Sequence, residues 1–226
     1  MTTKKKIAPA KKKVLVVDDH PMMRQGLTQL INFEPDLIVC GEAENAHQAL
    51  AAVGTLKPDL VLADITMPGK NGLEFIKDVH AMYPGTAVLA VSMHDESIYA
   101  ERVLRAGGRG YIMKQEGGKK LMHAIRQVLN GEIYVSEKMA AKILEIFSGR
   151  RATSSQSPVE QLTDREFEVF QLIGQGRGTR EIAGHLHLSV KTIEVHRLHI
   201  KTKLKILTAP ELIRSAVRWV ETQGGG

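Results

Sequence analysis

Short apolar runs alternate with amphipathic stretches over residues 14–131 of the chain. The runs have the length and continuity of strands buried on both faces of a parallel sheet. They are Val14–Val17, Leu37–Cys40, Leu60–Ala63, Ala87–Val91 and Tyr111–Met113. Between them, apolar residues recur at helical spacing over Met23–Ile31, Ala46–Val53, Leu73–Val79, Tyr99–Leu104 and, most clearly, Leu121–Leu129. Strands alternating with helices in this way predict a right-handed, doubly wound α/β domain.

The pattern changes after residue 131. A further helix is predicted over Ser136–Phe147, and the polar run Ser148–Pro158 is typical of a flexible linker. Beyond it come four short helical patterns and no strand pattern. Thr163 and Glu166 have the spacing of a capping box before the first, Ser189 starts the third, which runs to about Leu204, and Pro210 stands in the first turn of the fourth. In the α/β part, Asn45 is a candidate N-cap. Short helices joined by tight turns indicate an all-α, four-helix domain of the helix-turn-helix type. The expected order is a disordered basic tail (1–13), the α/β domain (14–131), a linker helix with a flexible linker (132–158) and the helix-turn-helix domain (159–223).

The formal net charge of +6 is unevenly distributed. Residues 1–13 hold six lysines and no acid, residues 14–147 hold 17 acidic and 13 basic side chains, and residues 148–226 hold 8 acidic and 12 basic ones. The basic second domain makes nucleic acid a candidate partner.

Composition also limits where the protein works. No run of 18 apolar residues occurs, so no membrane span is expected, and the lysine-rich start lacks the apolar segment of a secretory signal. The single cysteine, Cys40, excludes an internal disulfide and a cysteine metal cage. A cytoplasmic protein is therefore expected.

Polar residues follow the predicted strands at one end of the sheet. Asp18 and Asp19 follow the first strand and Asp64 the third, and in a doubly wound sheet these strand ends face one crevice. Taken singly, each aspartate is better explained as part of a turn or as a helix cap. Converging carboxylates repel one another unless a cation joins them, and oxygen ligands without cysteine favour Mg²⁺. Ser92 and Lys114 end the fourth and fifth strands, which completes a site that can receive a phosphoryl group on Asp64.

Four separated motifs carry a family resemblance: residues 16–20 (VVDDH), 59–69 (DLVLADITMPG), 92–95 (SMHD) and 110–114 (GYIMK). Together, over about residues 12–131, they resemble a bacterial response-regulator receiver. The resemblance implies a flavodoxin-like (βα)5 fold with strand order 2-1-3-4-5, and a sensor histidine kinase as phosphoryl donor.

The receiver resemblance also implies roles for individual residues. Asp64 becomes the phospho-acceptor, and Mg²⁺ is held by Asp19, by Asp64, by the backbone carbonyl of Thr66 and, through water, by Asp18. Ser92 becomes the switch hydroxyl and Lys114 the phosphate-binding lysine. Tyr111 becomes the aromatic residue whose rotamer reports the state of the switch, although a half-buried strand tyrosine is the simpler interpretation of its pattern.

The predicted helix 189–204 has two faces on a helical wheel. Val190, Ile193, Ile200 and Leu204 form one apolar stripe, which should face the core. The opposite side supplies candidates for contacts to base edges, and the helix end supplies candidates for phosphate contacts. The base-edge candidates are Lys191, Glu194, Val195 and Leu198, the phosphate candidates are Lys201, Lys203 and Lys205, and Thr192 is a further candidate for DNA binding. Composition alone is equally compatible with a solvated charged face.

A second resemblance favours DNA. Residues 162–166 (LTDRE), 181–183 (EIA) and 189–196 (SVKTIEVH) are similar to a LuxR-type helix-turn-helix over about residues 159–221. This implies double-stranded DNA as a partner, with RNA polymerase as a further candidate. It also implies a homodimer formed through the last helix, for which Trp219 is a plausible anchor. The alternative is that the small domain uses the whole apolar arc of that helix for its own core. A zinc site among His185, His187, His196 and His199 is a lesser interpretation.

Together the two resemblances indicate a response regulator of the LuxR/NarL/FixJ type, a transcription regulator and not an enzyme. The rival is a phosphohydrolase that works through an aspartyl phosphate. Such enzymes need a second aspartate two residues after the nucleophile, where this chain has Thr66. A receiver that no longer accepts phosphate is disfavoured because all the expected site residues are present.

Overall fold

The computed structural model describes residues 10–67, 70–147 and 158–224. The expected tail up to residue 9 and the expected linker at 148–157 lie outside the described residues. The chain divides into two compact units, Met1–Met139 and Ala140–Gly226. Among the described residues, no helix combines the length and the apolar character needed to cross a membrane.

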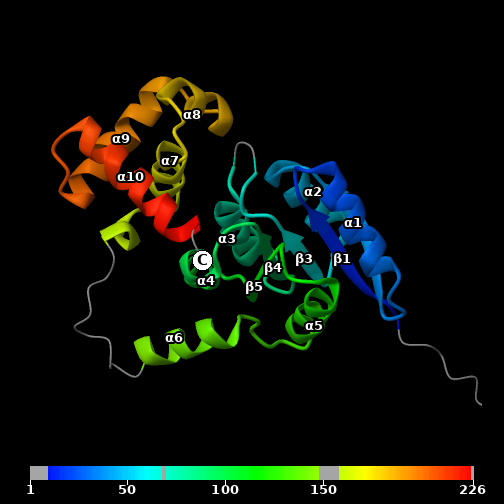
Figure 1. Cartoon of the computed structure of the whole chain (residues 1–226). Coiled ribbons are helices and arrows are strands. Elements are labelled where there is room, and N and C mark those ends of the chain that lie inside the picture. Colours follow the sequence, from blue (N-terminus) through cyan, green and yellow to red (C-terminus); the bar gives the residue numbers. More distant parts are fainter. Residues whose placement is uncertain (1–9, 68–69, 148–157, 225–226) are drawn as a thin grey trace, which may run out of the picture. The chain divides into compact units, whose positions relative to one another are not determined.

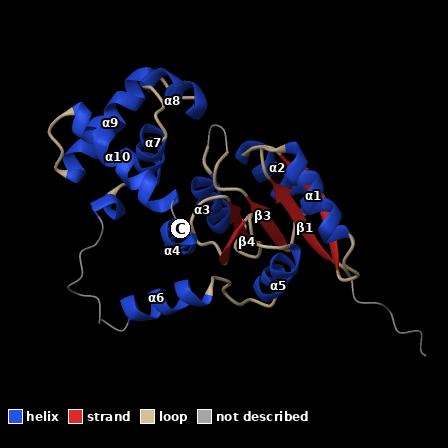
Figure 2. Ribbon diagram, viewed as in Figure 1, coloured by secondary structure: helices blue, strands red, loops and turns tan. Residues whose placement is uncertain are grey.

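The first unit contains a parallel sheet between two layers of helices (Figures 1 and 2). Its strands are β1 (Lys12–Val17), β2 (Leu37–Ala43), β3 (Leu60–Ala63), β4 (Ala87–Ser92) and β5 (Gly110–Met113). Their order is β2-β1-β3-β4-β5, and all neighbouring pairs are parallel. The doubly wound fold and the strand order are thereby confirmed.

Five helices cover the two faces of this sheet. They are α1 (Pro21–Asn32), α2 (Ala46–Leu56), α3 (Gly72–Met82), α4 (Glu96–Arg105) and α5 (Gly118–Leu129). Side chains of α1 and α5 share one core with β1, β3 and β4, and α2, α3 and α4 pack next to one another on the other face. Asn45 caps α2, with its side chain accepting from the Gln48 N–H, as the pattern predicted.

Two details of the apolar pattern were wrong. The run that became β2 was expected to be buried on both faces, but Ile38 is 43% exposed because β2 is an edge strand. Leu30, expected on the core face of α1, is 48% exposed, while Leu27 and Ile31 are buried. At this edge of the sheet, the core is covered by β1, the one strand that pairs with β2, and by the narrow buried stripe of α1 that contains Leu27 and Ile31.

The second unit is helical. After α6 (Glu137–Phe147), which spans the division between the units, come a short 3-10 turn η1 (Pro158–Gln161) and four helices, α7 (Asp164–Gly174), α8 (Thr179–Leu186), α9 (Val190–Leu204) and α10 (Ala209–Gly224). The predicted capping box is present, since Thr163 accepts from the Glu166 N–H and the Glu166 carboxylate accepts from the Thr163 N–H. Ser189 caps α9 and Pro210 lies in the first turn of α10, both as predicted. The four-helix domain is therefore confirmed.

Tertiary packing changes one expectation for α9. Val190 was placed on the core stripe but is 40% exposed, because the first turn of α9 extends past the core that buries Ile193 and Ile200. In α10, Trp219 is half-buried, and its ring packs edge-on against Phe167 and Phe170 of its own domain, at centroid distances of 5.2 and 6.0 Å. Its role as an anchor between copies stays a prediction.

Candidate phosphorylation and DNA-binding sites

The polar residues at the strand ends of the first unit come together. Lys114, directly after β5, places its Nζ 2.6 Å from Asp18 Oδ2 and 2.7 Å from Asp64 Oδ2. Asp18 follows β1 and Asp64 follows β3, and all three side chains are almost completely buried. One ammonium thus joins two carboxylates that are 46 residues apart in the chain. The strand ends converge because the strands run parallel.

Burial dominates the electrostatics of this pocket. Burial raises the pKa of Asp64 to about 6, although the Lys114 ammonium and the Thr66 N–H (3.1 Å from Asp64 Oδ1) act in the opposite direction. Burial acts to lower the pKa of Lys114, but the Asp64 and Asp18 carboxylates outweigh it and raise that pKa. Near neutral pH the pocket therefore holds a charged lysine beside an ionised, poorly solvated carboxylate.

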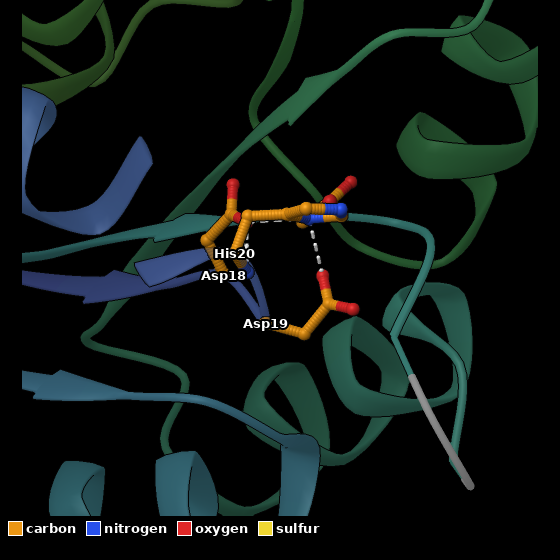
Figure 3. A group of neighbouring side chains, drawn as sticks. Asp18, Asp19 and His20 are labelled. Carbon is orange, nitrogen blue, oxygen red and sulfur yellow. Dashed lines mark hydrogen bonds and ion pairs between the residues drawn. The ribbon is translucent and has the colours of Figure 1, made fainter. Parts of the chain in front are cut away.

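A cation would complete this pocket. Asp18, Asp19, His20 and Asp64 each offer a ligand atom, and these atoms lie within 4.8 Å of one another. Asp19 Oδ1 is buried, yet no described residue donates a hydrogen bond to it. Its close neighbour is His20 Nδ1 at 2.8 Å, which forms an ion pair with it when the imidazole is protonated (Figure 3). A buried oxygen without a donor, among further carboxylate oxygens, fits a hard ion such as Mg²⁺.

His20 is the residue of this group that the sequence interpretation missed. It was taken for an isolated surface histidine, and its side chain is indeed 69% exposed. Its backbone N–H nevertheless donates to Asp18 Oδ1 at 2.9 Å, and its ring lies against Asp19. The available signal was its position directly after the Asp18-Asp19 pair.

The expected switch residues meet on one side of the pocket. Ser92 Oγ accepts a hydrogen bond from the His94 N–H (3.3 Å), and the Tyr111 hydroxyl donates to the His94 carbonyl oxygen (2.7 Å). The His94 ring lies 2.8 Å from the Thr66 hydroxyl. Tyr111 is fully buried, not half-buried, and burial raises its pKa. Ser92 and Tyr111 are thus linked through the backbone of His94.

In the second unit, the predicted base-edge candidates lie on the outward face of α9. Lys191, Glu194, Val195 and Leu198 are exposed, and the two apolar members of this set are 43% and 56% exposed, respectively. Thr192 is half-buried, with its hydroxyl 2.8 Å from that of Ser189 at the start of the helix. Exposed apolar side chains between charged ones suit a groove lined with thymine methyls and polar base edges.

The two lysines near the end of α9 differ. Lys201 is half-buried, whereas Lys203 donates from Nζ to Glu166 Oε2 at 2.6 Å. Glu166 is buried, which acts to raise its pKa, but Lys203 and the Thr163 N–H outweigh this and lower it. Lys203 therefore ties α9 to α7 in this structure and is not presented as a phosphate ligand. The histidines considered for zinc form no metal-binding group among the described residues.

Comparison with known proteins gives the same division of the chain. Residues 14–126 match the model of the response regulator receiver domain, and residues 160–216 match that of bacterial regulatory proteins of the luxR family. The oxygen regulatory protein NreC of Staphylococcus carnosus is 35% identical over 210 residues, which cover 91% of this chain and 97% of that one.

Solved structures with the same fold include the RcsB response regulator of Salmonella typhimurium, with a TM-score of 0.68 and 23% identity over 92% of this chain and 98% of that one. A LuxR-family two-component response regulator from Aurantimonas is 31% identical, with a TM-score of 0.57, over 62% of this chain and 99% of that one. Both the receiver and the helical domain are therefore found together in known proteins.

Proposed function

Since the chain belongs to the two-component response regulators that join a receiver to a LuxR-type DNA-binding domain, we propose that a phosphoryl group on Asp64 controls how this transcription regulator binds its operators. The observation that carries the proposal is the contact of Lys114 with both Asp18 and Asp64 in a buried pocket. A lysine held there can neutralise charge on a transferred phosphoryl group.

The transfer uses few side chains. A carboxylate oxygen of Asp64 bonds to phosphorus while the P–N bond to the kinase histidine breaks, and the imidazole keeps the electron pair. The Lys114 ammonium would move from the carboxylates to a phosphoryl oxygen. Asp19, Asp64 and the Thr66 carbonyl would hold Mg²⁺ directly and Asp18 through water, and the bound ion supplies positive charge opposite the phosphoryl oxygens.

The switch follows from the hydrogen bonds around His94. Ser92 Oγ here accepts from the His94 N–H. A phosphoryl oxygen on Asp64 would be a charged acceptor for the Ser92 hydroxyl hydrogen, so the hydroxyl would turn toward it. Because His94 also accepts the hydrogen bond of Tyr111, this change would be felt by β5. Phosphate thereby makes contacts that differ between two states, which is what shifts an equilibrium.

The DNA-binding part of the proposal concerns α9. Lys191, Glu194, Val195 and Leu198 would face base edges in the major groove, with Thr192 at the rim and Lys201 near a phosphate. Two copies of the domain would pair through α10, where Ile213 is 43% exposed and Val217 half-buried. RNA polymerase is a further proposed partner, and the cytoplasm is the proposed compartment because the DNA target lies there.

The test is direct labelling. In the presence of Mg²⁺ and acetyl phosphate, the wild-type protein should take up phosphate on Asp64. The Asp64→Ala variant and wild-type protein in EDTA should take up none. Label that persists in Asp64→Ala, or that forms equally well in EDTA, would contradict the proposed site.

The phosphohydrolase alternative has less support. It needs an acid/base residue two positions after the nucleophile, and Thr66 stands there with its hydroxyl against His94. A threonine hydroxyl is too weak an acid and too weak a base near neutral pH to replace that carboxyl group, so rapid turnover of the acyl phosphate is not expected.

A further inference from the structure

The segment between α5 and α6 runs back along the edge of the sheet. Gly110 of β5 forms an isolated parallel bridge with Tyr134. The Tyr111 N–H donates to the Tyr134 carbonyl oxygen (2.9 Å), and the Tyr134 N–H donates to the Arg109 carbonyl oxygen (3.0 Å). The chain thus forms a single strand-like bridge beside β5, although no strand pattern marks these residues in the sequence.

The close approach of this segment depends on glycine. A Cβ at Gly110 would lie 2.6 Å from the Tyr134 carbonyl oxygen and 3.0 Å from Leu89 Cδ1. Backbone atoms cannot yield at that distance without moving the segment. The glycine of β5 is therefore required by the segment that covers the sheet edge.

A second attachment joins the segment to α4. The Ser136 N–H donates to Glu96 Oε1 at 2.6 Å, and the Ser136 hydroxyl accepts from the Met139 N–H at 3.2 Å. Ser136 therefore caps α6 while it is bound to the first residue of α4. Met139, in the first turn of α6, is 3% exposed.

Both attachments lead to the switch. The β5 side reaches Tyr111, whose hydroxyl donates to the His94 carbonyl oxygen. The α4 side reaches Glu96, two residues after His94, and the His94 N–H is held by Ser92 Oγ. From either side, few covalent or hydrogen bonds separate the start of α6 from the side chains that would respond to phosphate on Asp64.

We propose that residues 133–139, here named the output segment, carry the state of the phosphorylation site to α6, with Glu96 and Gly110 as positioning residues that hold the segment to the switch. The inference rests on the proposed function. A movement of Ser92 and His94 toward phosphate shifts Glu96, and a movement of Tyr111 shifts its hydrogen bond to Tyr134. Either movement changes the position of the α6 cap.

The experiment uses the full chain and the variants Glu96→Ala and Glu96→Gln, with Glu101→Ala as the matched control. Glu101 lies on the same helix and pairs with Arg105, four residues on, at 2.5 Å. Three quantities are measured with and without acetyl phosphate and Mg²⁺. They are the label on the protein, the hydrogen exchange of the Ser136 amide and of α6, and the affinity for a duplex selected by wild-type protein from a random-sequence library.

Glu96→Ala should take up as much label as the wild type, whereas its Ser136 amide should exchange at least about tenfold faster, since its acceptor is gone. The gain in DNA affinity on phosphorylation should fall by about fivefold or more, a typical size for coupling between two sites. Glu96→Gln keeps an acceptor oxygen and should retain most of the gain, and Glu101→Ala should behave like the wild type. A merely structural role for Glu96 would lower affinity equally in both states.

A second pair of variants tests the β5 attachment. Tyr134→Pro removes the N–H that donates to Arg109, and Tyr134→Ala keeps it. The proline variant should lose the phosphorylation-dependent gain and the alanine variant should keep it. Full gain in both Glu96→Ala and Tyr134→Pro, with normal label, would overturn the inference and leave the proposed function intact. Absence of label on wild-type protein would overturn the proposed function, and the inference with it.

Discussion

The buried carboxylate of Asp64 should lower the free energy of unfolding of the unphosphorylated protein. The Asp64→Asn variant should therefore be more stable than the wild type. Burial raises the pKa of Asp64 from 3.8 to about 6 in the folded protein. Folded molecules therefore bind more protons than unfolded ones between these two pH values, and wild-type stability falls as the pH rises through this window. A difference of about two pKa units corresponds to about 3 kcal/mol. Asparagine has no charge to bury.

The assay is urea denaturation of both proteins in EDTA at pH 4 and at pH 7.5. The free energy of unfolding of Asp64→Asn should exceed that of the wild type by about 3 kcal/mol at pH 7.5, with a melting temperature higher by about 10 °C. At pH 4 the gain should nearly vanish, because wild-type Asp64 is then largely protonated. Added Mg²⁺ should stabilise the wild type more than the variant.

Asp59 serves as the matched control, and its substitution should change the stability in the opposite direction. Asp59 accepts hydrogen bonds from the Lys13 N–H (2.8 Å) and from Lys12 Nζ (3.0 Å), and its pKa is lowered although its partial burial acts to raise it. Asp59→Asn should therefore lower stability at pH 7.5 and have less effect at acid pH. Equal gains for Asp64→Asn at both pH values, or a loss at pH 7.5, would refute the reasoning from desolvation.

Three further outcomes are expected. Lys191→Ala should weaken binding to the selected duplex by about 1–3 kcal/mol and relax base preference at one position, whereas Lys201→Ala should weaken binding to every sequence and reduce the salt dependence of binding. Competition assays with other duplexes distinguish the two effects, and an equal loss on all sequences for Lys191→Ala would mean that Lys191 contacts a phosphate. Lys203→Met should lower the free energy of unfolding at pH 7 by about 1.5–3 kcal/mol. The loss should become smaller below the ordinary glutamate pKa of 4.5, because a protonated Glu166 has no charge for Lys203 to neutralise. Denaturation at pH 7 and at pH 3.5 measures the loss, and an equal loss at both pH values would mean that packing, not charge, is involved. Val217→Asp should abolish cooperative binding to a duplex with two half-sites in gel-shift titrations without unfolding the domain, and unchanged cooperativity would place the dimer interface elsewhere.

Local pattern was sufficient to predict most elements of this chain. The alternation of apolar runs and helical stripes placed all five strands and the helices between them, and the capping residues Asn45, Thr163 and Ser189 stand where the sequence indicated. The parallel direction of the strands also follows from this alternation, because a helix after a strand returns the chain to the end of the sheet where that strand began. For that reason the polar residues at the strand ends, Asp18, Asp64 and Lys114, could be expected together. The order of the strands was implied by the family resemblance.

Other features depended on contacts between side chains that lie far apart in the sequence. The position of Lys203 toward the end of α9 made it a candidate for a phosphate contact, but only the fold brings Glu166 within 2.6 Å of its ammonium. The arc of α10 contained Trp219, but only α7 decides that its ring packs on Phe167 and Phe170.

The same distinction explains β2 and Tyr134. Periodicity reports which positions share a face, so the sequence by itself determined the elements, their caps and the strand-end chemistry. It does not report how many neighbours a strand has, so the exposure of β2 and the strand-like pairing of Tyr134 with Gly110 were decided only by the tertiary structure. Backbone hydrogen bonds at a sheet edge can be satisfied by any segment that passes there, whatever its side chains, and which segment passes is set by the path of the whole chain.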